Sequence, residues 1–202
     1  VAPGHRACRS RVAELISEVA APDIVAKLGS RLVRVRHPDG GLGAGIVPTS
    51  RDSLVWYLTH DTRRWPPDGG EESLRRLAGT VADWPWPFPD LLSRTDFATS
   101  YVWRTADMDA LPCLFRENVV LVGDAAHPFL PFSTQGVSSA LVDAVTLADA
   151  RAGEAPLAAA LGAWSARRSE VLPAYLEYGR ARAAAFLDPV PSMGDPPFPE
   201  AA

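Results

Sequence analysis

The sequence predicts an α/β fold with α+β character, in which a partial parallel-sheet element accompanies an antiparallel sheet and C-terminal helices. An unbroken aliphatic run at residues 119–122 leads through a turn into a helical pattern, as strands of parallel sheets do. Residues 31–60 contain short alternating apolar segments between turn residues, which indicates antiparallel strands. From residue 157 onward, apolar residues recur every three or four positions, which indicates helices. With 202 residues and 47% hydrophobic content, the chain can bury a core.

Residues 118–150 follow the order strand, loop, helix. The run at 119–122 has no polar alternation, so we expect a strand that is covered on both faces. Asp124 then lies at the carboxyl end of this strand, which is the edge where open α/β sheets bind ligands. A carboxylate at that edge is well placed to accept hydrogen bonds from ligand hydroxyls.

The helix of this segment is predicted to begin at Gln135 and Gly136, with Ser133 or Thr134 as its cap. One stripe of this helix is expected to pack on the sheet, and it comprises Val137, Ala140, Leu141, Ala144, Leu147 and Ala148. The N–H groups of the first helical turn would stay free, and they favour an electron-rich ligand.

A short motif in this segment resembles that of a known family. Gly123-Asp124-Ala125-Ala126-His127, with the later residues Pro131, Gln135, Gly136, Asp143 and Ala144, resembles the second FAD fingerprint of the aromatic-ring hydroxylases. These are single-component flavin monooxygenases. The resemblance implies that Asp124 binds ribityl or ribose hydroxyls of FAD, and that the helix directs its positive end at the flavin pyrimidine ring. The cofactor-binding residues that it implies are Gly123, Asp124, Ala125, Pro131, Thr134, Gln135, Gly136, Val137 and Ser138.

The resemblance also implies an activity. FAD reduced by NAD(P)H would react with O₂ and oxygenate a small organic substrate, for example an aromatic one. Because the cofactor carries this chemistry, no residue is assigned as catalytic. The predicted function is therefore that of a part of an FAD-dependent monooxygenase.

Two alternatives stay open from the sequence. The segment could be a buried strand, loop and helix without a ligand, or the chain could be a non-enzymatic remnant that serves as an interaction or scaffold protein. The family usually has Gly where Thr134 stands and Asn where Ser138 stands. Its G-x-G-x-x-G turn for the ADP pyrophosphate does not occur in this sequence, and the resemblance covers residues 31–188. We therefore expect the chain alone to bind FAD weakly, and to need a missing N-terminal half or self-association.

The chain divides by pattern into four parts. Residues 1–30 are predicted to be helical, with one helix at 9–20 and a second that Pro22 opens and Gly29 ends. Residues 31–112 would form a partial substrate-binding sheet domain, in which Trp56 and Tyr57 are expected to be core residues. Residues 113–188 would complete the FAD-binding domain with closing helices, and 189–202 form a proline-rich, loosely ordered tail.

Three details of these parts are also predicted. The Trp-Pro alternation at residues 84–88 cannot continue a helix, so it is interpreted as a turn that packs on the fold. Pro173 is expected to kink or restart the last helix. Arg168 is placed on the more polar side of its helix, and Arg180 on a solvated face.

Charge and composition exclude several function classes. The net charge of −4 argues against nucleic acid binding, which needs a concentrated basic surface. No run of 18 apolar residues and no signal peptide is present in the sequence, so no membrane span and a cytoplasmic location are predicted. Cys8 and Cys113 are expected to be ordinary thiols. No carboxylate partner for His127 is evident, so a packing role in the loop is preferred to a chemical one.

Overall fold

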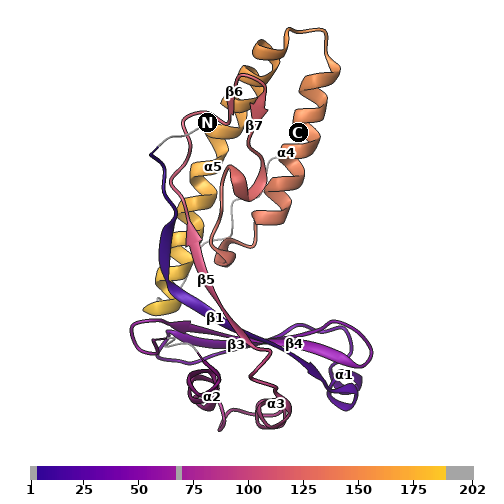
Figure 1. Cartoon of the computed structure of the whole chain (residues 1–202), viewed down its shortest axis with the longest axis vertical. Coiled ribbons are helices and arrows are strands. Elements are labelled where there is room, and N and C mark those ends of the chain that lie inside the picture. The colour runs from indigo at the N-terminus through magenta and orange to yellow at the C-terminus, as the bar shows by residue number, and fades with distance from the viewer. Residues whose placement is uncertain (1–3, 67–69, 190–202) are drawn as a thin grey trace. The chain divides into compact units, whose positions relative to one another are not determined.

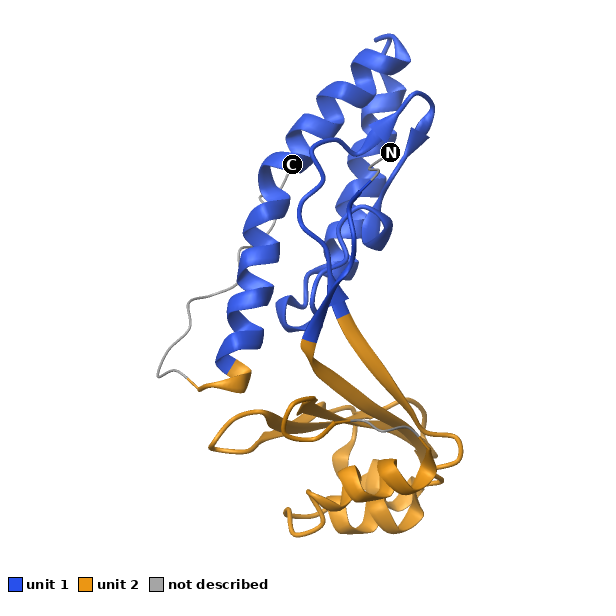
Figure 2. Ribbon diagram, turned by 60° about the vertical axis from the view of Figure 1, so that its left-hand side comes forward, with its two compact units in different colours: residues 1–10, 106–185, 190–202 blue, residues 11–105, 186–189 orange. Residues whose placement is uncertain are grey.

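The computed structural model describes residues 4–66 and 70–189, which form two compact units. Unit 1 comprises residues 1–10, 106–185 and 190–202, and unit 2 comprises residues 11–105 and 186–189 (Figure 2). The elements in chain order are β1 (Cys8–Ala20), α1 (Pro22–Leu28), β2 (Val33–Arg36), β3 (Leu42–Pro48), β4 (Ser53–Asp61), α2 (Glu71–Gly79), α3 (Phe88–Arg94), β5 (Tyr101–Asp107), β6 (Phe115–Arg116), β7 (Val119–Val120), the 3-10 helices η1 (Gly123–Ala125) and η2 (Pro131–Ser133), α4 (Gly136–Ala152) and α5 (Leu157–Leu187) (Figure 1). The mixed α/β fold with an antiparallel sheet and C-terminal helices is thus confirmed.

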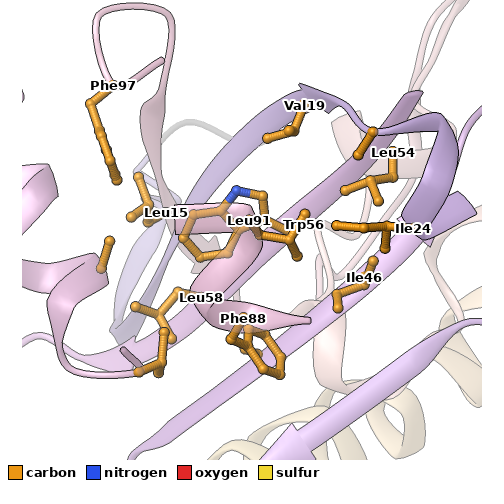
Figure 3. Close-up of a cluster of buried hydrophobic side chains, with 14 of the residues drawn as sticks. Leu15, Val19, Ile24, Ile46, Leu54, Trp56, Leu58, Phe88, Leu91 and Phe97 are labelled. Atoms are coloured by element: carbon orange, nitrogen blue, oxygen red, sulfur yellow. The ribbon is translucent and has the colours of Figure 1, made fainter. Parts of the chain in front are cut away.

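Unit 2 is built on a five-stranded sheet with the strand order β2-β3-β4-β1-β5. The pairs β2–β3, β3–β4 and β1–β4 are antiparallel, as the alternation at 31–60 predicts for the first two. The side chains of Leu54, Trp56 and Leu58 leave β4 on one face and lie among those of Phe88 and Leu91 of α3 (Figure 3). Trp56 is fully buried and its Nε1–H donates to Thr95 Oγ1 at 3.0 Å, which confirms it as a core residue.

The predicted helix at residues 9–20 is wrong, because this stretch is the strand β1. Val12, Ile16 and Val19 fit the spacing of a helical face, but the burial along the strand alternates from Ala13 to Val19. Nine residues of β1 pair with β4, from Val12–Asp61 to Ala20–Ser53, and this long ladder decides the structure. The second predicted helix is confirmed as α1, which Gly29 ends with φ +63°.

Glycines shape the turn between β2 and β3. Gly40 has φ +70°, and a Cβ there would lie 2.5 Å from Pro189 Cδ, so only glycine fits. Gly45 lies within β3 opposite Tyr57, and a Cβ on it would overlap the Tyr57 ring. The turn between the two strands thus spans residues 37–41, because β2 ends at Arg36 and β3 begins at Leu42.

Two further segments of unit 2 can be compared with the predictions. Helix α2 packs on the core of unit 2 through its buried residues Leu74 and Leu77. The Trp-Pro run does not continue α2, as predicted, but it leads directly into α3, which the sequence did not indicate. Trp84 packs edge-on against Phe88, with ring centroids 5.5 Å apart.

Unit 1 contains α4, most of α5 and the two-stranded antiparallel sheet of β6 and β7 (Figure 1). The expectation of a strand at 119–122 covered on both faces is wrong here, since β7 spans only two residues and Val119 is 54% exposed. β7 pairs antiparallel with β6, and each of these strands has two residues. They form a short hairpin and not a long strand in the middle of a sheet. Helix α5 continues through Pro173 without a restart.

The apolar stripe predicted to pack from α4 lies elsewhere than expected. Val137 is 77% exposed and Leu141 is 63% exposed, whereas Ser139 and Asp143 are the buried residues of this helix. A polar network around Asp143 fixes this orientation of α4, as described below. Within residues 4–66 and 70–189, no helix is long and apolar enough to cross a membrane. Cys8 and Cys113 carry free thiols, and the predicted tail lies outside the described residues except for residue 189.

Candidate functional site: a turn and a helix N-terminus in unit 1

All nine residues that the resemblance implies for cofactor binding lie in one segment of unit 1, residues 123–138. Gly123, Asp124 and Ala125 form η1, which packs against α4. Pro131 begins η2, and Thr134 is the C-cap of η2. Gln135 is the N-cap of α4, whose first turn comprises Gly136, Val137 and Ser138. The structure thus joins two turns to the N-terminus of a 17-residue helix.

Asp124 is exposed and follows Gly123, whose backbone conformation favours glycine. Gly123 has φ +54°, and a Cβ on it would lie 3.2 Å from Ala140 Cβ. This left-handed conformation turns the chain sharply where it leaves the short strand β7. The Asp124 carboxylate therefore projects from a fixed turn into solvent, where a ligand hydroxyl can reach it.

The N-terminus of α4 offers backbone donors. The first N–H groups of a helix have no partner within the helix, and Gln135 provides no side-chain cap. The predicted cap by Ser133 or Thr134 is therefore wrong. Ser133 Oγ instead accepts a hydrogen bond from the N–H of Gln135 at 3.3 Å and donates to Leu130 O at 3.1 Å, so it stabilises the loop before the helix.

Thr134 adopts the left-handed conformation, with φ +56°. A β-branched residue rarely takes this conformation, whereas glycine takes it freely. Thr134 thus has the backbone conformation that suits the Gly usually found at this position in the family. Its N–H donates to Pro131 O at 3.1 Å, and its Oγ1 donates to Ser133 O at 2.7 Å. These bonds within the turn help hold Thr134 in this conformation.

A buried carboxylate lies behind the turn. Asp143 of α4 is fully buried, and its Oδ2 accepts from the Gly123 N–H at 2.8 Å and meets His127 Nε2 at 2.6 Å. Its Oδ1 accepts from Arg168 Nε of α5 at 2.6 Å. Arg168 Nη2 in turn donates to Ser139 Oγ at 2.7 Å. We call this set, Asp143 with His127, Arg168 and Ser139, the Asp143 network.

The electrostatics of the Asp143 network keep its central carboxylate ionised. Burial by itself raises the pKa of Asp143, but the hydrogen bonds from His127, the Gly123 amide and Arg168 outweigh it, so the pKa lies below its usual value. His127 stacks on Phe129, with ring centroids 4.8 Å apart, and its Nδ1 is buried without a partner among the described residues. Nε2 is therefore the ring nitrogen through which His127 joins the Asp143 network.

Sequence reasoning missed this network. It assigned His127 no carboxylate partner and placed Arg168 on the more polar side of its helix, whereas Asp143 is that partner and Arg168 is 5% exposed. One signal could have indicated it: Ser139 and Asp143 are polar residues four positions apart on one face of a helix that is otherwise rich in aliphatic residues. Arg180, also expected on a solvated face, pairs with Asp107 and Asp109.

The donors and acceptors of this segment fit a flavin nucleotide. Asp124 is an exposed acceptor for sugar-alcohol hydroxyls, and the first turn of α4 offers N–H donors to an electron-rich ring. Among residues 4–66 and 70–189, no three His, Cys, Asp or Glu side chains are grouped as metal ligands.

Comparison with known proteins yields a family and a fold. A family model described as an FAD binding domain matches residues 3–188. The aurachin C monooxygenase/isomerase of Stigmatella aurantiaca is 36% identical over 135 residues, which are 64% of this chain and 34% of that protein. The 3-amino-4-hydroxybenzoate 2-monooxygenase PtnB3 of Streptomyces platensis is 28% identical over 151 residues, which are 72% of this chain and 35% of that protein.

Solved structures share the fold at low identity. Klebsiella pneumoniae HpxO, solved with FAD and uric acid, aligns with a TM-score of 0.77 and 22% identity over 90% of this chain and 46% of that chain. The 2,6-dihydroxypyridine-3-hydroxylase of Arthrobacter nicotinovorans aligns with a TM-score of 0.73 and 19% identity over 99% of this chain and 60% of that chain. The chain therefore spans about a third of these two curated relatives and about half of these two structures.

Proposed function

Because this chain belongs to the FAD binding domain family, whose model matches residues 3–188, we propose that it forms part of an FAD-dependent monooxygenase and contributes the ribityl-binding and pyrimidine-binding part of the flavin site. The observation that carries the proposal is the exposed Asp124 carboxylate on a left-handed glycine turn next to a helix N-terminus. The two relatives reported above are monooxygenases by name, which favours this function over that of a scaffold protein.

Each part of the segment has a proposed role. Asp124 accepts hydrogen bonds from ribityl or ribose hydroxyls, and the N–H groups at 136–138 face the flavin pyrimidine, where their positive dipole favours electron density. Gly123 lets the backbone turn, and Pro131 fixes φ at the start of the second turn. When bound, FAD supplies the redox and oxygen chemistry, with NAD(P)H as reductant and a small organic compound as substrate.

The remaining contacts to FAD would come from outside this chain. The described residues offer no second helix N-terminus preceded by a G-x-G-x-x-G turn, so a further half of the flavin site is proposed to bind the ADP portion. FAD binding by this chain alone is then expected to be weak. Stoichiometric sub-micromolar FAD binding by the chain alone, followed by flavin fluorescence, would contradict this part of the proposal.

The substitution Asp124→Ala tests the proposed contact. A hydrogen bond to a charged acceptor contributes about 1.5 to 3 kcal/mol, so FAD affinity should fall roughly tenfold to a hundredfold. The melting temperature should barely change, because the Asp124 side chain is exposed. Flavin fluorescence titration and thermal unfolding are measured on the same variant, in a protein that joins this chain to an ADP-binding half.

Asp149→Ala is the matched control, since Asp149 is an exposed aspartate on α4 outside the site. It should leave FAD affinity unchanged. If Asp124→Ala lowers the melting temperature and keeps the affinity, Asp124 stabilises the loop and does not bind the cofactor.

A further inference from the structure

The backbone N–H and C=O of Gly123 are both held by hydrogen bonds. Its N–H donates to Asp143 Oδ2 at 2.8 Å, and its C=O accepts from the N–H groups of Ala126 and His127, both at 2.9 Å. The dihedral angles of Gly123 set the direction in which Asp124 leaves the turn. A glycine is the residue whose dihedral angles change most easily, so these bonds restrict the rotation that would most displace the Asp124 carboxylate.

The restraint on Gly123 is anchored in two helices. Asp143 lies in α4, and Arg168 of α5 binds its second oxygen at 2.6 Å. The same guanidinium also holds Ser139 of α4 through Oγ at 2.7 Å and through the backbone O at 3.3 Å. The turn is therefore anchored to two helices, which is the arrangement that gives a site a defined geometry.

Stability alone is a poor explanation for this arrangement. A buried ion pair loses about as much solvation as it gains in attraction, and apolar residues of similar volume often serve equally well. An apolar residue at position 143 could fill the space, but it could not accept the Gly123 N–H. The carboxylate is thus the chemical feature that links the two helices to the turn.

We propose that Asp143, held by Arg168 and His127, is a positioning residue that sets the direction of Asp124 toward the ribityl chain of FAD. This inference rests on the function proposed above. The network lies behind the turn, and its role is exerted through Gly123. Asp143 itself is not expected to touch the cofactor, because it is fully buried.

The substitution Asp143→Asn, made in the complete flavoprotein, tests the proposal. Asn keeps the size but has one acceptor oxygen, so it cannot accept from Gly123, His127 and Arg168 together. Hydrogen exchange of the peptide covering residues 121–128 should become at least tenfold faster, while peptides from residues 174–185 keep their protection. FAD affinity, titrated well below the melting temperature, should fall about tenfold or more.

Two further variants make the result decisive. Asp149→Asn removes an exposed charge from the same helix and should change neither quantity. Arg168→Lys keeps the charge but lacks the planar fork that binds Asp143 and Ser139 together, so an intermediate effect on both quantities is expected. This variant also serves if Asp143→Asn does not fold.

The outcomes separate this inference from the proposed function. If exchange rises uniformly over unit 1, or if FAD affinity is unchanged while 121–128 exchanges faster, Asp143 is only structural and the inference is wrong. If the unsubstituted flavoprotein binds no FAD, the proposed function fails. In that case unchanged exchange at 121–128 would in addition show that Asp143 does not hold the turn.

Discussion

In unit 2 a large apolar cluster forms the core and the buried carboxylate of Asp61 lies at the end of strand β4, whereas in unit 1 the most buried side chain of helix α4 is a carboxylate. Among the described residues, the unit 2 core comprises nineteen buried apolar residues, including Leu58 and Trp56, which are fully buried (Figure 3). Among the described residues of unit 1, one apolar cluster has five buried members, which are Leu111, Leu114, Ala126, Trp164 and Leu172. Apolar burial is not directional, but hydrogen bonds are. Unit 1 is thus suited to holding a turn in one geometry.

The largest expected effect comes from breaking the polar centre of unit 1. Arg168→Ala leaves the buried Asp143 carboxylate without its guanidinium partner, and removing one member of a buried pair typically costs about 3 to 5 kcal/mol. Urea unfolding should show this loss in the free energy of unfolding. Hydrogen exchange should locate it in unit 1, while strands β3 and β4 of unit 2 keep their protection.

Arg167→Ala is the control for this experiment, because Arg167 is the exposed neighbour on the same helix. Its effect should stay within about 0.5 kcal/mol. Equal losses for the two variants, or equal loss of protection in both units, would show that the units do not differ in the way described.

The same contrast explains which parts of the fold the sequence could predict. The strands at 31–60 were predictable because side chains next to each other in sequence alternate between the two faces. The stretch 9–20 was not, because Val12, Ile16 and Val19 fit the spacing of a helical face, and only pairing with the distant β4 makes this stretch a strand.

The candidate site divides similarly. Its turn residues stand together in sequence, so the motif itself indicated Gly123, Asp124 and the start of α4. The Asp143 network joins side chains that are 16 and 25 residues apart, and its formation depends on how α4 and α5 pack. No local pattern encodes that packing, since Arg168 has exposed neighbours of similar polarity.

A smaller effect is expected at Glu14 in the sheet of unit 2. Burial raises the pKa of Glu14, and the hydrogen bond from Thr59 Oγ1 at 3.0 Å and the charge of Arg34 only partly offset it. A carboxyl whose pKa is raised by folding disfavours the folded state when ionised. Its cost is thus absent below the ordinary pKa of about 4.5, and it appears as the pH rises through the raised pKa.

Glu14→Gln should therefore stabilise the protein slightly at pH 7, by about 0.5 kcal/mol, with a gain that shrinks toward pH 4.5. The pH dependence of stability that comes from Asp143 has the opposite sign, because folding lowers the pKa of Asp143. The stability that it contributes is lost only as the pH falls below the ordinary pKa of 3.8. Thermal unfolding between pH 4.5 and 8 measures the gain, with Glu18→Gln on the same strand as the exposed control. A gain that grows on acidification would contradict the stated cause.

The smallest effect on stability is expected on the outer face of α4. Val137, Leu141 and Val145 recur every four residues and are 77%, 63% and 61% exposed, so they form an apolar stripe on one helix face. An exposed stripe of this kind favours association, and we expect self-association through it when the chain is alone.

Leu141→Gln should change the free energy of unfolding by no more than about 0.5 kcal/mol, yet reduce both light scattering at high concentration and binding of the dye ANS. Leu32→Gln replaces a leucine of unit 2 that is 56% exposed and lies outside this stripe, so it should leave association as it was. If the unsubstituted chain is a strict monomer and binds no ANS, the stripe does not mediate association. If the two variants have equal effects, general surface hydrophobicity drives association, and this helix face does not.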